Sequence, residues 1–161
     1  MLYLDSSALI KHYIQEAGTQ ALNAKLQREE NAGRSPFTSV LAFAEIHRAF
    51  AQRSKDGSLT KSDYVVAREA FEADWLFGLT SIELASSVLA FIPDIVERFP
   101  LKSSDAVHLA SALWMRDLFR LSGKQVPKGS KVAFATSDVA LGKAALASGL
   151  ELFNPQVQSL P

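Results

Sequence analysis

Leu2-Tyr3-Leu4-Asp5-Ser6-Ser7-Ala8-Leu9-Ile10 is the stretch of sequence that decides the fold. Its short apolar run stops at Asp5, a pattern typical of a buried strand. Either of the two serines that follow can cap a helix that continues through Tyr13. A buried strand that leads directly into a helix is the repeating unit of an α/β protein.

The same alternation continues along the rest of the chain. Further strands are expected at residues 37–39, within 75–82, at 132–135 and at 150–153. The helices expected between them span residues 19–30, 40–53, 61–74, 83–98, 105–121 and 137–148. Pro93 must bend or split the helix at 83–98, and Ser103 and Ser104 are expected to cap the helix at 105–121. The pattern predicts a single-domain, three-layer α/β/α sandwich over residues 1–161, with a mainly parallel central sheet.

Composition excludes several classes of protein. The 161 residues carry 17 basic and 17 acidic side chains, so the chain is not coated in positive charge, although a charged patch on one face remains open. The absence of cysteine excludes disulfides, thiolate metal sites and a cysteine nucleophile. No apolar run reaches the roughly 18 residues that span a bilayer, and residues 1–5 lack the features of a signal peptide. We therefore expect a cytoplasmic protein that contacts no membrane.

Acidic residues fall where functional groups gather in parallel sheets, beyond the carboxyl ends of the strands. Asp5 follows the first strand and Asp138 follows the strand at 132–135, while Asp105 opens a helix. Glu45 lies one turn into a helix that is otherwise nearly all apolar, where a charge needs a partner: either Arg48 or a metal ion. Each acid taken alone also has a structural explanation, as a helix cap, a turn residue or one member of a surface ion pair.

Convergence of these acids would require a cation, because neighbouring carboxylates raise one another's pKa. With oxygen ligands and no cysteine, the ion would be Mg²⁺ or Mn²⁺. Such ions polarise phosphoryl oxygens and activate water for in-line attack, so the hypothesis is phosphodiester hydrolysis.

Four acidic segments, in order, resemble the motifs of the PIN-domain ribonucleases, specifically the VapC toxins of bacterial toxin–antitoxin systems. The segments are Leu4-Asp5-Ser6-Ser7-Ala8-Leu9-Ile10-Lys11, Ser39-Val40-Leu41-Ala42-Phe43-Ala44-Glu45-Ile46, Ser104-Asp105-Ala106-Val107-His108-Leu109-Ala110-Ser111-Ala112 and Ala135-Thr136-Ser137-Asp138. The resemblance covers essentially the whole chain, and the third segment is its most specific part.

This resemblance implies a divalent-metal-dependent endoribonuclease whose catalytic and metal-binding residues are Asp5, Glu45, Asp105 and Asp138. It implies that Ser7 and Thr136 orient carboxylates or water around that site. It also implies a transfer RNA or ribosomal RNA target, a homodimer, and a cognate antitoxin protein whose tail crosses the active-site groove.

Basic and apolar residues supply further candidates. Lys11, Arg48 and Arg116 are candidate contacts for RNA phosphates, and residues 116–131 carry a local excess of positive charge. His108, three residues after Asp105, is interpreted as structural. A set of large apolar side chains is expected mainly in the core rather than on a partner surface: Phe71, Trp75, Leu76, Phe77 and Trp114.

Alternative functions stay open. A catalytically inactive PIN-like module that binds RNA or protein would keep the fold without the reaction. A phosphatase of the haloacid-dehalogenase type also begins with a strand and an aspartate, but it needs a second aspartate where this chain has Ser7. A receiver-like signalling domain needs adjacent acids near the first strand, and this chain lacks them.

Overall fold

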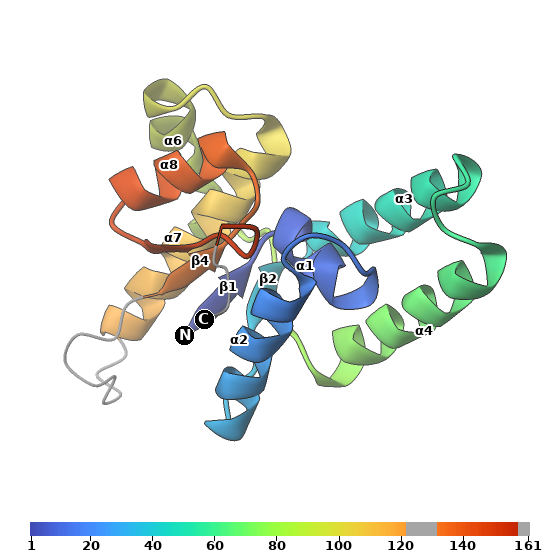
Figure 1. Cartoon of the computed structure of the whole chain (residues 1–161). Helices are drawn as coiled ribbons and strands as arrows, with labels where there is room; N and C mark the ends of the chain where they lie inside the picture. Colours follow the sequence, from blue (N-terminus) through green and yellow to red (C-terminus); the bar gives the residue numbers. More distant parts are fainter. Residues whose placement is uncertain (122–131, 158–161) are drawn as a thin grey trace.

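The central sheet of the protein is parallel throughout. The computed structural model describes residues 1–121 and 132–157. Five strands pair in the order β3-β2-β1-β4-β5 (Figure 1). They are β1 (Leu2–Leu4), β2 (Phe37–Ser39), β3 (Thr80–Ile82), β4 (Ala133–Ala135) and β5 (Glu151–Phe153). All five strands lie within the ranges predicted from the sequence.

Helices fill the connections between strands, as the alternation predicts. They are α1 (Ser6–Tyr13), α2 (Thr19–Asn31), α3 (Leu41–Lys55), α4 (Lys61–Phe77), α5 (Ser86–Leu89), α6 (Ile92–Arg98), α7 (Ser103–Leu121) and α8 (Val139–Ala147). The helix expected at 83–98 is split, because Pro93 lies in the first turn of α6, where its missing N–H costs least.

Two apolar layers enclose the sheet because successive strand residues point to opposite faces. On β1, Tyr3 joins a core with residues of α5, α6, α7 and α8, whereas Leu2 and Leu4 join a second core with residues of α1, α2, α3 and α4. β4 alternates in the same way, with Phe134 in the first core and Ala133 and Ala135 in the second. The three-layer α/β/α prediction is confirmed, and Figure 1 shows the two groups of helices on opposite sides of the strands.

Three local predictions are wrong. Asp5 itself caps α1, by accepting a hydrogen bond from the Ala8 N–H, so neither following serine is the cap. Ser103 and Ser104 are the first residues of α7 rather than its caps. Phe71 is fully buried as expected, but Leu76 and Phe77 are 71% and 88% exposed because they lie in the last turn of α4, beyond the core.

Parallel pairing fixes which side chains share an edge of the sheet. Leu4 of β1 is paired with Ala135 of β4, and the Asp5 N–H continues this pairing by donating to the Ala135 carbonyl. The residues that follow both strands therefore emerge together at the carboxyl edge. No helix in the described ranges 1–121 and 132–157 is long and apolar enough to cross a membrane.

Candidate active site

Asp5 lies at the centre of the carboxyl edge and is almost fully buried. Its Oδ1 accepts the capping bond from the Ala8 N–H at 2.8 Å, and its Oδ2 accepts from the Thr136 hydroxyl at 2.7 Å. The Ser7 hydroxyl lies 2.9 Å from both carboxylate oxygens. Burial raises the pKa of Asp5, and the nearby His108 and these hydrogen bonds only partly oppose that rise.

Ser7 and Thr136 join the end of β1 to the end of β4. The Ser7 Oγ accepts from the Ser137 N–H at 2.9 Å, and the Thr136 Oγ1 accepts from the Asp138 N–H at 3.0 Å. Asp138 in turn caps α8 by accepting from the Leu141 N–H at 2.8 Å. Both hydroxyl groups thus hold Asp5 and the backbone beside Asp138 in one hydrogen-bonded unit.

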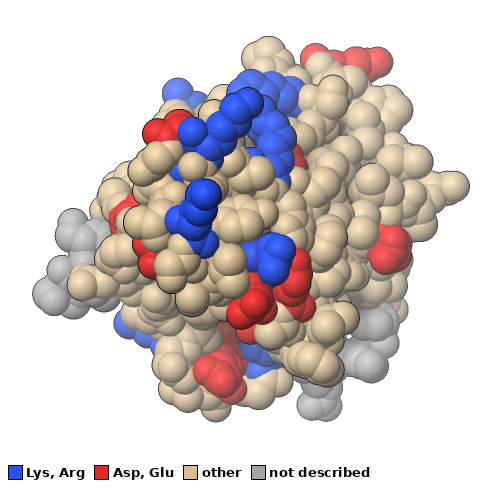
Figure 2. All heavy atoms as spheres, turned by 90° about the vertical axis from the view of Figure 1, so that its right-hand side faces the viewer, with Lys and Arg blue, Asp and Glu red and all other residues tan. Residues whose placement is uncertain are grey.

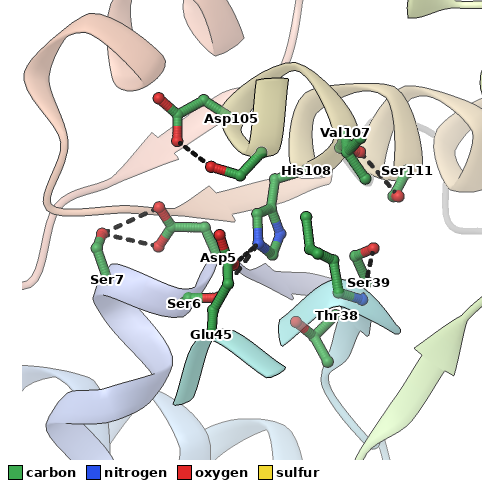
Figure 3. Close-up of polar contacts among 12 residues, drawn as sticks. Asp5, Ser6, Ser7, Thr38, Ser39, Glu45, Asp105, Val107, His108 and Ser111 are labelled. Atoms are coloured by element: carbon green, nitrogen blue, oxygen red, sulfur yellow. Dashed lines mark hydrogen bonds and ion pairs between the residues drawn. The ribbon is translucent and has the colours of Figure 1, made fainter. Parts of the chain in front are cut away.

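Glu45 reaches the same region from α3, which follows the neighbouring strand β2. Its Oε2 lies 2.8 Å from the Nε2 of His108 and also accepts a hydrogen bond from Ser6 (Figure 3). Burial raises the pKa of Glu45, but the bonds from His108 and Ser6 outweigh it and leave this pKa below its ordinary value. The partner of Glu45 is therefore His108, and Arg48 points instead to an exposed surface.

Asp105 completes the set from the first turn of α7, one helical turn before His108 (Figure 3). Burial raises its pKa, and the negative charges of Asp138 and Glu45 raise it further, against Lys102 and His108. The charges of Asp138 and Glu45 therefore act on Asp105, and the three carboxylates contribute to one region of negative potential.

The structure brings all four predicted acids to this acidic edge, defined here as Asp5, Glu45, Asp105 and Asp138. It adds Ser6 and His108, which the sequence analysis did not assign to the site. For His108 a signal was present, because three residues after Asp105 is one turn along the same helix face. For Ser6 no such signal was present, because nothing in the sequence distinguishes Ser6 from the adjacent Ser7 as the residue that contacts Glu45.

The predicted phosphate contacts do not lie together. Lys11 is 3% exposed and forms an ion pair with Glu16 at 2.6 Å, so its charge is turned inward and away from any ligand. Arg116 lies three turns along α7 from Asp105 and bonds to Asp117 and to the Ser148 carbonyl. Of these three, Arg48 is the one that is exposed and has no ion pair or hydrogen bond from its side chain to another described residue. The predicted basic excess at 116–131 falls largely on residues 122–131, which lie outside the described residues.

Positive charge also gathers on the face formed by α3 and α4 (Figure 2). Arg48, Lys55 and Lys61 of these helices are exposed, and Arg53 and Arg68 are half-buried. Asp and Glu side chains occupy another part of the same face (Figure 2). Although the net charge of the chain is zero, its positive and negative side chains are therefore separated on this face.

A hard divalent cation fits the acidic edge in donor type and in charge. The edge offers carboxylate and hydroxyl oxygens, and its acids raise the pKa of Asp105 as uncompensated neighbours do. Across residues 1–121 and 132–157, however, no three His, Asp or Glu side chains are already arranged around one point as metal ligands. The backbone thus gathers the acids, while their side chains are engaged with hydroxyl, imidazole and N–H groups.

Comparison with known proteins identifies ribonucleases of similar sequence and solved structures of similar fold. Ribonuclease VapC45 of Mycobacterium tuberculosis strain CDC 1551 / Oshkosh and Ribonuclease VapC49 of strain ATCC 25618 / H37Rv are each 30% identical over 117 residues. Each alignment covers 73% of this chain and 78% of the relative. Ribonuclease VapC47 of strain CDC 1551 / Oshkosh is 30% identical over 112 residues, or 70% of this chain and 74% of the relative. No protein-family model matches the chain.

Two crystal structures share the fold over almost the whole length. A chain in VapBC2 from Rickettsia felis, bound to a DNA fragment from its promoter, matches with a TM-score of 0.64 at 11% identity and covers 96% of this chain and 98% of its own. A chain in FitAcB from Neisseria gonorrhoeae matches with a TM-score of 0.65 at 16% identity, and the match covers 98% of this chain and 100% of the FitAcB chain.

The parallel sheet and these whole-length matches place the chain in the class of PIN-like α/β/α domains. Within that class, the curated relatives show that the chain belongs to the VapC ribonuclease family.

Proposed function

We propose that this chain is a divalent-metal-dependent endoribonuclease that hydrolyses RNA phosphodiester bonds and acts as the toxin of a VapBC-type toxin–antitoxin pair. The observation that carries the proposal is the acidic edge, to which β1, α3, α7 and the end of β4 each contribute one carboxylate. A cluster of this charge is costly unless a cation or a proton neutralises it. The membership of the chain in the VapC ribonuclease family supports the same chemistry.

In this proposal Asp5, Glu45, Asp105 and Asp138 hold one or more Mg²⁺ or Mn²⁺ ions. When bound, such an ion polarises a phosphoryl oxygen and lowers the pKa of water for in-line attack. The hydroxyl groups of Ser7 and Thr136 fix both oxygens of Asp5, so this carboxylate presents a constant orientation. A phosphatase mechanism is disfavoured because Ser7 stands where that class needs a second aspartate.

RNA is the proposed substrate, with transfer RNA or ribosomal RNA as the expected class. Arg48, which is exposed and lies three residues after Glu45 on α3, is the proposed phosphate contact near the acidic edge. Because such contacts release counterions, binding is expected to weaken steeply as salt rises.

An antitoxin is the proposed protein partner, and a homodimer of this single domain in the cytoplasm is the proposed working form. A surface pocket of about 390 Å³ between α1, α2 and the end of α4 is lined partly by Tyr13, Leu26 and Phe77. Its mixture of apolar and polar side chains suits an amphipathic segment of a partner. The solved VapBC2 and FitAcB complexes share the fold and support a search for such a partner.

The decisive experiment is cleavage of an RNA pool by purified protein with Mg²⁺ or Mn²⁺. We expect cleavage that EDTA abolishes and that returns when the ion is restored. D5N and D105N should each reduce the rate by orders of magnitude, because each removes one charge from the acidic edge without changing its shape. E30Q is the matched control, because Glu30 is an exposed acid that bonds only to Gln27 among the described side chains.

Two outcomes would contradict the proposal in different ways. RNA binding without cleavage under any divalent ion would favour an inactive binding module. Release of phosphate from small phosphomonoesters through a trapped aspartyl intermediate would favour a phosphatase.

A further inference from the structure

His108 uses both of its ring nitrogens inside the protein. The side chain is 2% exposed and lies on α7 one turn after Asp105. Its Nε2 lies 2.8 Å from Glu45 Oε2 and 3.2 Å from the Ser6 hydroxyl, while its Nδ1 lies 3.0 Å from the hydroxyl of Tyr3. A carboxylate only accepts hydrogen bonds, so Nε2 carries the proton that is donated to Glu45.

Tyr3 is a rigid support for that imidazole. It is fully buried on β1, the middle strand of the sheet, and its ring stacks on Phe134 with centroids 5.2 Å apart and planes 8° from parallel. The two rings of Tyr3 and His108 meet edge to face at 6.0 Å. Burial raises the pKa of the Tyr3 phenol well above its ordinary value, so the hydroxyl keeps the proton needed to donate to Nδ1.

Glu45 needs such a support more than Asp5 and Asp138 do. Asp5 and Asp138 are each fixed by a capping bond to a backbone N–H, whereas the partners of Glu45 among the described residues are side chains. It extends from α3, while the nearby Asp105 belongs to α7, and the negative charges of the two repel each other. The bond to His108 crosses from α7 to α3 and offsets that repulsion (Figure 3).

We propose that His108, held in place by Tyr3, is a positioning residue that fixes the Glu45 carboxylate at the acidic edge and so sets the affinity of that edge for a divalent cation. This inference rests on the proposed function and goes beyond it, because it assigns a role to Tyr3 and His108, two buried residues that are not among the four acids. Hydrogen-bond partners behind a metal ligand typically change affinity or activity by about 10- to 100-fold when removed.

The test measures Mn²⁺ binding by the electron paramagnetic resonance signal of the free ion, alongside kcat and KM for RNA cleavage. H108A should weaken Mn²⁺ binding by about 10- to 100-fold and lower kcat at subsaturating ion, with KM for RNA unchanged. H108Q keeps an N–H donor of similar reach and should recover much of the loss. Y3F keeps the stacked ring but removes the hydroxyl, and should show a smaller loss than H108A.

His12 provides the matched control, because this exposed histidine bonds to Asn23 and pairs with Asp74, and among the described residues it has no contact with the acidic edge. H12Q should bind Mn²⁺ as the wild type does. Thermal unfolding without metal identifies any variant that is merely misfolded, and H108Q and Y3F keep the test valid if H108A is unstable.

A double-mutant cycle separates positioning from an independent role. If His108 acts through Glu45, then E45Q/H108A should bind Mn²⁺ no more weakly than E45Q alone. The inference would be overturned if the fold-loss of Mn²⁺ affinity in the double variant equalled the product of the losses in the two single variants. Wild-type Mn²⁺ affinity in H108A would overturn it as well. Wild-type protein that binds Mn²⁺ but cuts no RNA would defeat the proposed function while leaving the binding test of His108 intact; wild-type protein that binds no Mn²⁺ would overturn both.

Discussion

At the scale of single residues, Thr136 shows how one hydroxyl serves two elements. It is fully buried, donates to Asp5 Oδ2 at 2.7 Å and accepts from the Asp138 N–H at 3.0 Å. A buried polar group without its partner costs about 1 to 3 kcal/mol. The hydroxyl therefore contributes to stability and to the orientation of Asp5 at once.

T136V should separate these two contributions. The change preserves shape but removes both hydrogen bonds, so we expect a loss of about 1 to 3 kcal/mol in the free energy of unfolding, measured in urea. RNA cleavage should fall by about 10-fold or more, because Asp5 loses a bond that orients it.

T38V is the control for that prediction. Thr38 is equally buried, but its hydroxyl donates only to the Leu4 carbonyl among the described residues. It should lose stability and retain cleavage. Equal loss of cleavage in both variants would show that the effect comes from the core and not from Asp5.

At the scale of elements, α1 and α3 are joined through the loop that precedes α2. Glu16 in this loop accepts from Lys11 of α1 through Oε1 and from Arg53 of α3 through Oε2, each at 2.6 Å. Burial raises the pKa of Glu16, but the bonds to Lys11 and Arg53 outweigh it, so this pKa lies below its ordinary value of 4.5. The buried Lys11 ammonium is thus neutralised by the half-buried Glu16 carboxylate.

This linkage predicts a pH-dependent stability difference between wild type and E16Q. The folded-state pKa of Glu16 is depressed, so its contribution is complete above the unfolded value near 4.5 and is lost as pH falls through the folded value. At pH 7, E16Q should be less stable by about 1 to 3 kcal/mol, because the buried Lys11 ammonium loses its charged partner.

Melting temperatures measured from pH 7 down to pH 3 check this prediction. The difference between wild type and E16Q should narrow below pH 4.5, where the wild-type glutamate begins to be protonated. E30Q, which makes the same charge change on an exposed side chain, should show no comparable difference. A constant gap for E16Q across the whole range would contradict the assignment.

At the scale of the whole molecule, segments from opposite ends of the chain are packed together. Thr136 lies 131 positions after Asp5 and still bonds to it. Gly18, at the start of α2, approaches the segment that follows β5: it adopts a φ of +94°, and a Cβ built on it would lie 2.8 Å from the carbonyl carbon of Pro155. Only glycine fits both constraints.

G18A should therefore destabilise the protein more than G57A does. Gly57 has a similar φ of +80°, but no atom lies within 4 Å of its missing Cβ. G57A should cost about 1 to 2 kcal/mol from backbone strain alone, and G18A should cost more because Pro155 must also move. Chemical denaturation of the two variants gives the comparison; equal losses would mean that the contact with Pro155 contributes nothing.

Much of the fold follows from local pattern. β2 is predicted to the residue because Pro36 precedes a short run of strand-forming side chains. α4 begins at residue 61, as predicted, because the Thr60 side chain caps it. Helix caps are harder where good capping residues are adjacent, as in Asp5-Ser6-Ser7, because each has the chemistry and only the backbone direction selects one. Leu76 and Phe77 are wrongly predicted to be buried, because hydropathy does not show that the last turn of α4 extends beyond the core.

By itself, the sequence determined that strands alternate with helices and that carboxylates follow β1 and β4, because both properties depend on neighbours a few positions away. The tertiary structure decided the partners. In the folded chain, Glu45 pairs with His108 and not with Arg48, and Lys11 faces inward and pairs with Glu16. His108 is in turn held by a hydrogen bond with the Tyr3 hydroxyl. Those choices depend on how α1, α3 and α7 pack against one sheet, and packing joins residues whose separation along the chain carries no periodic signal.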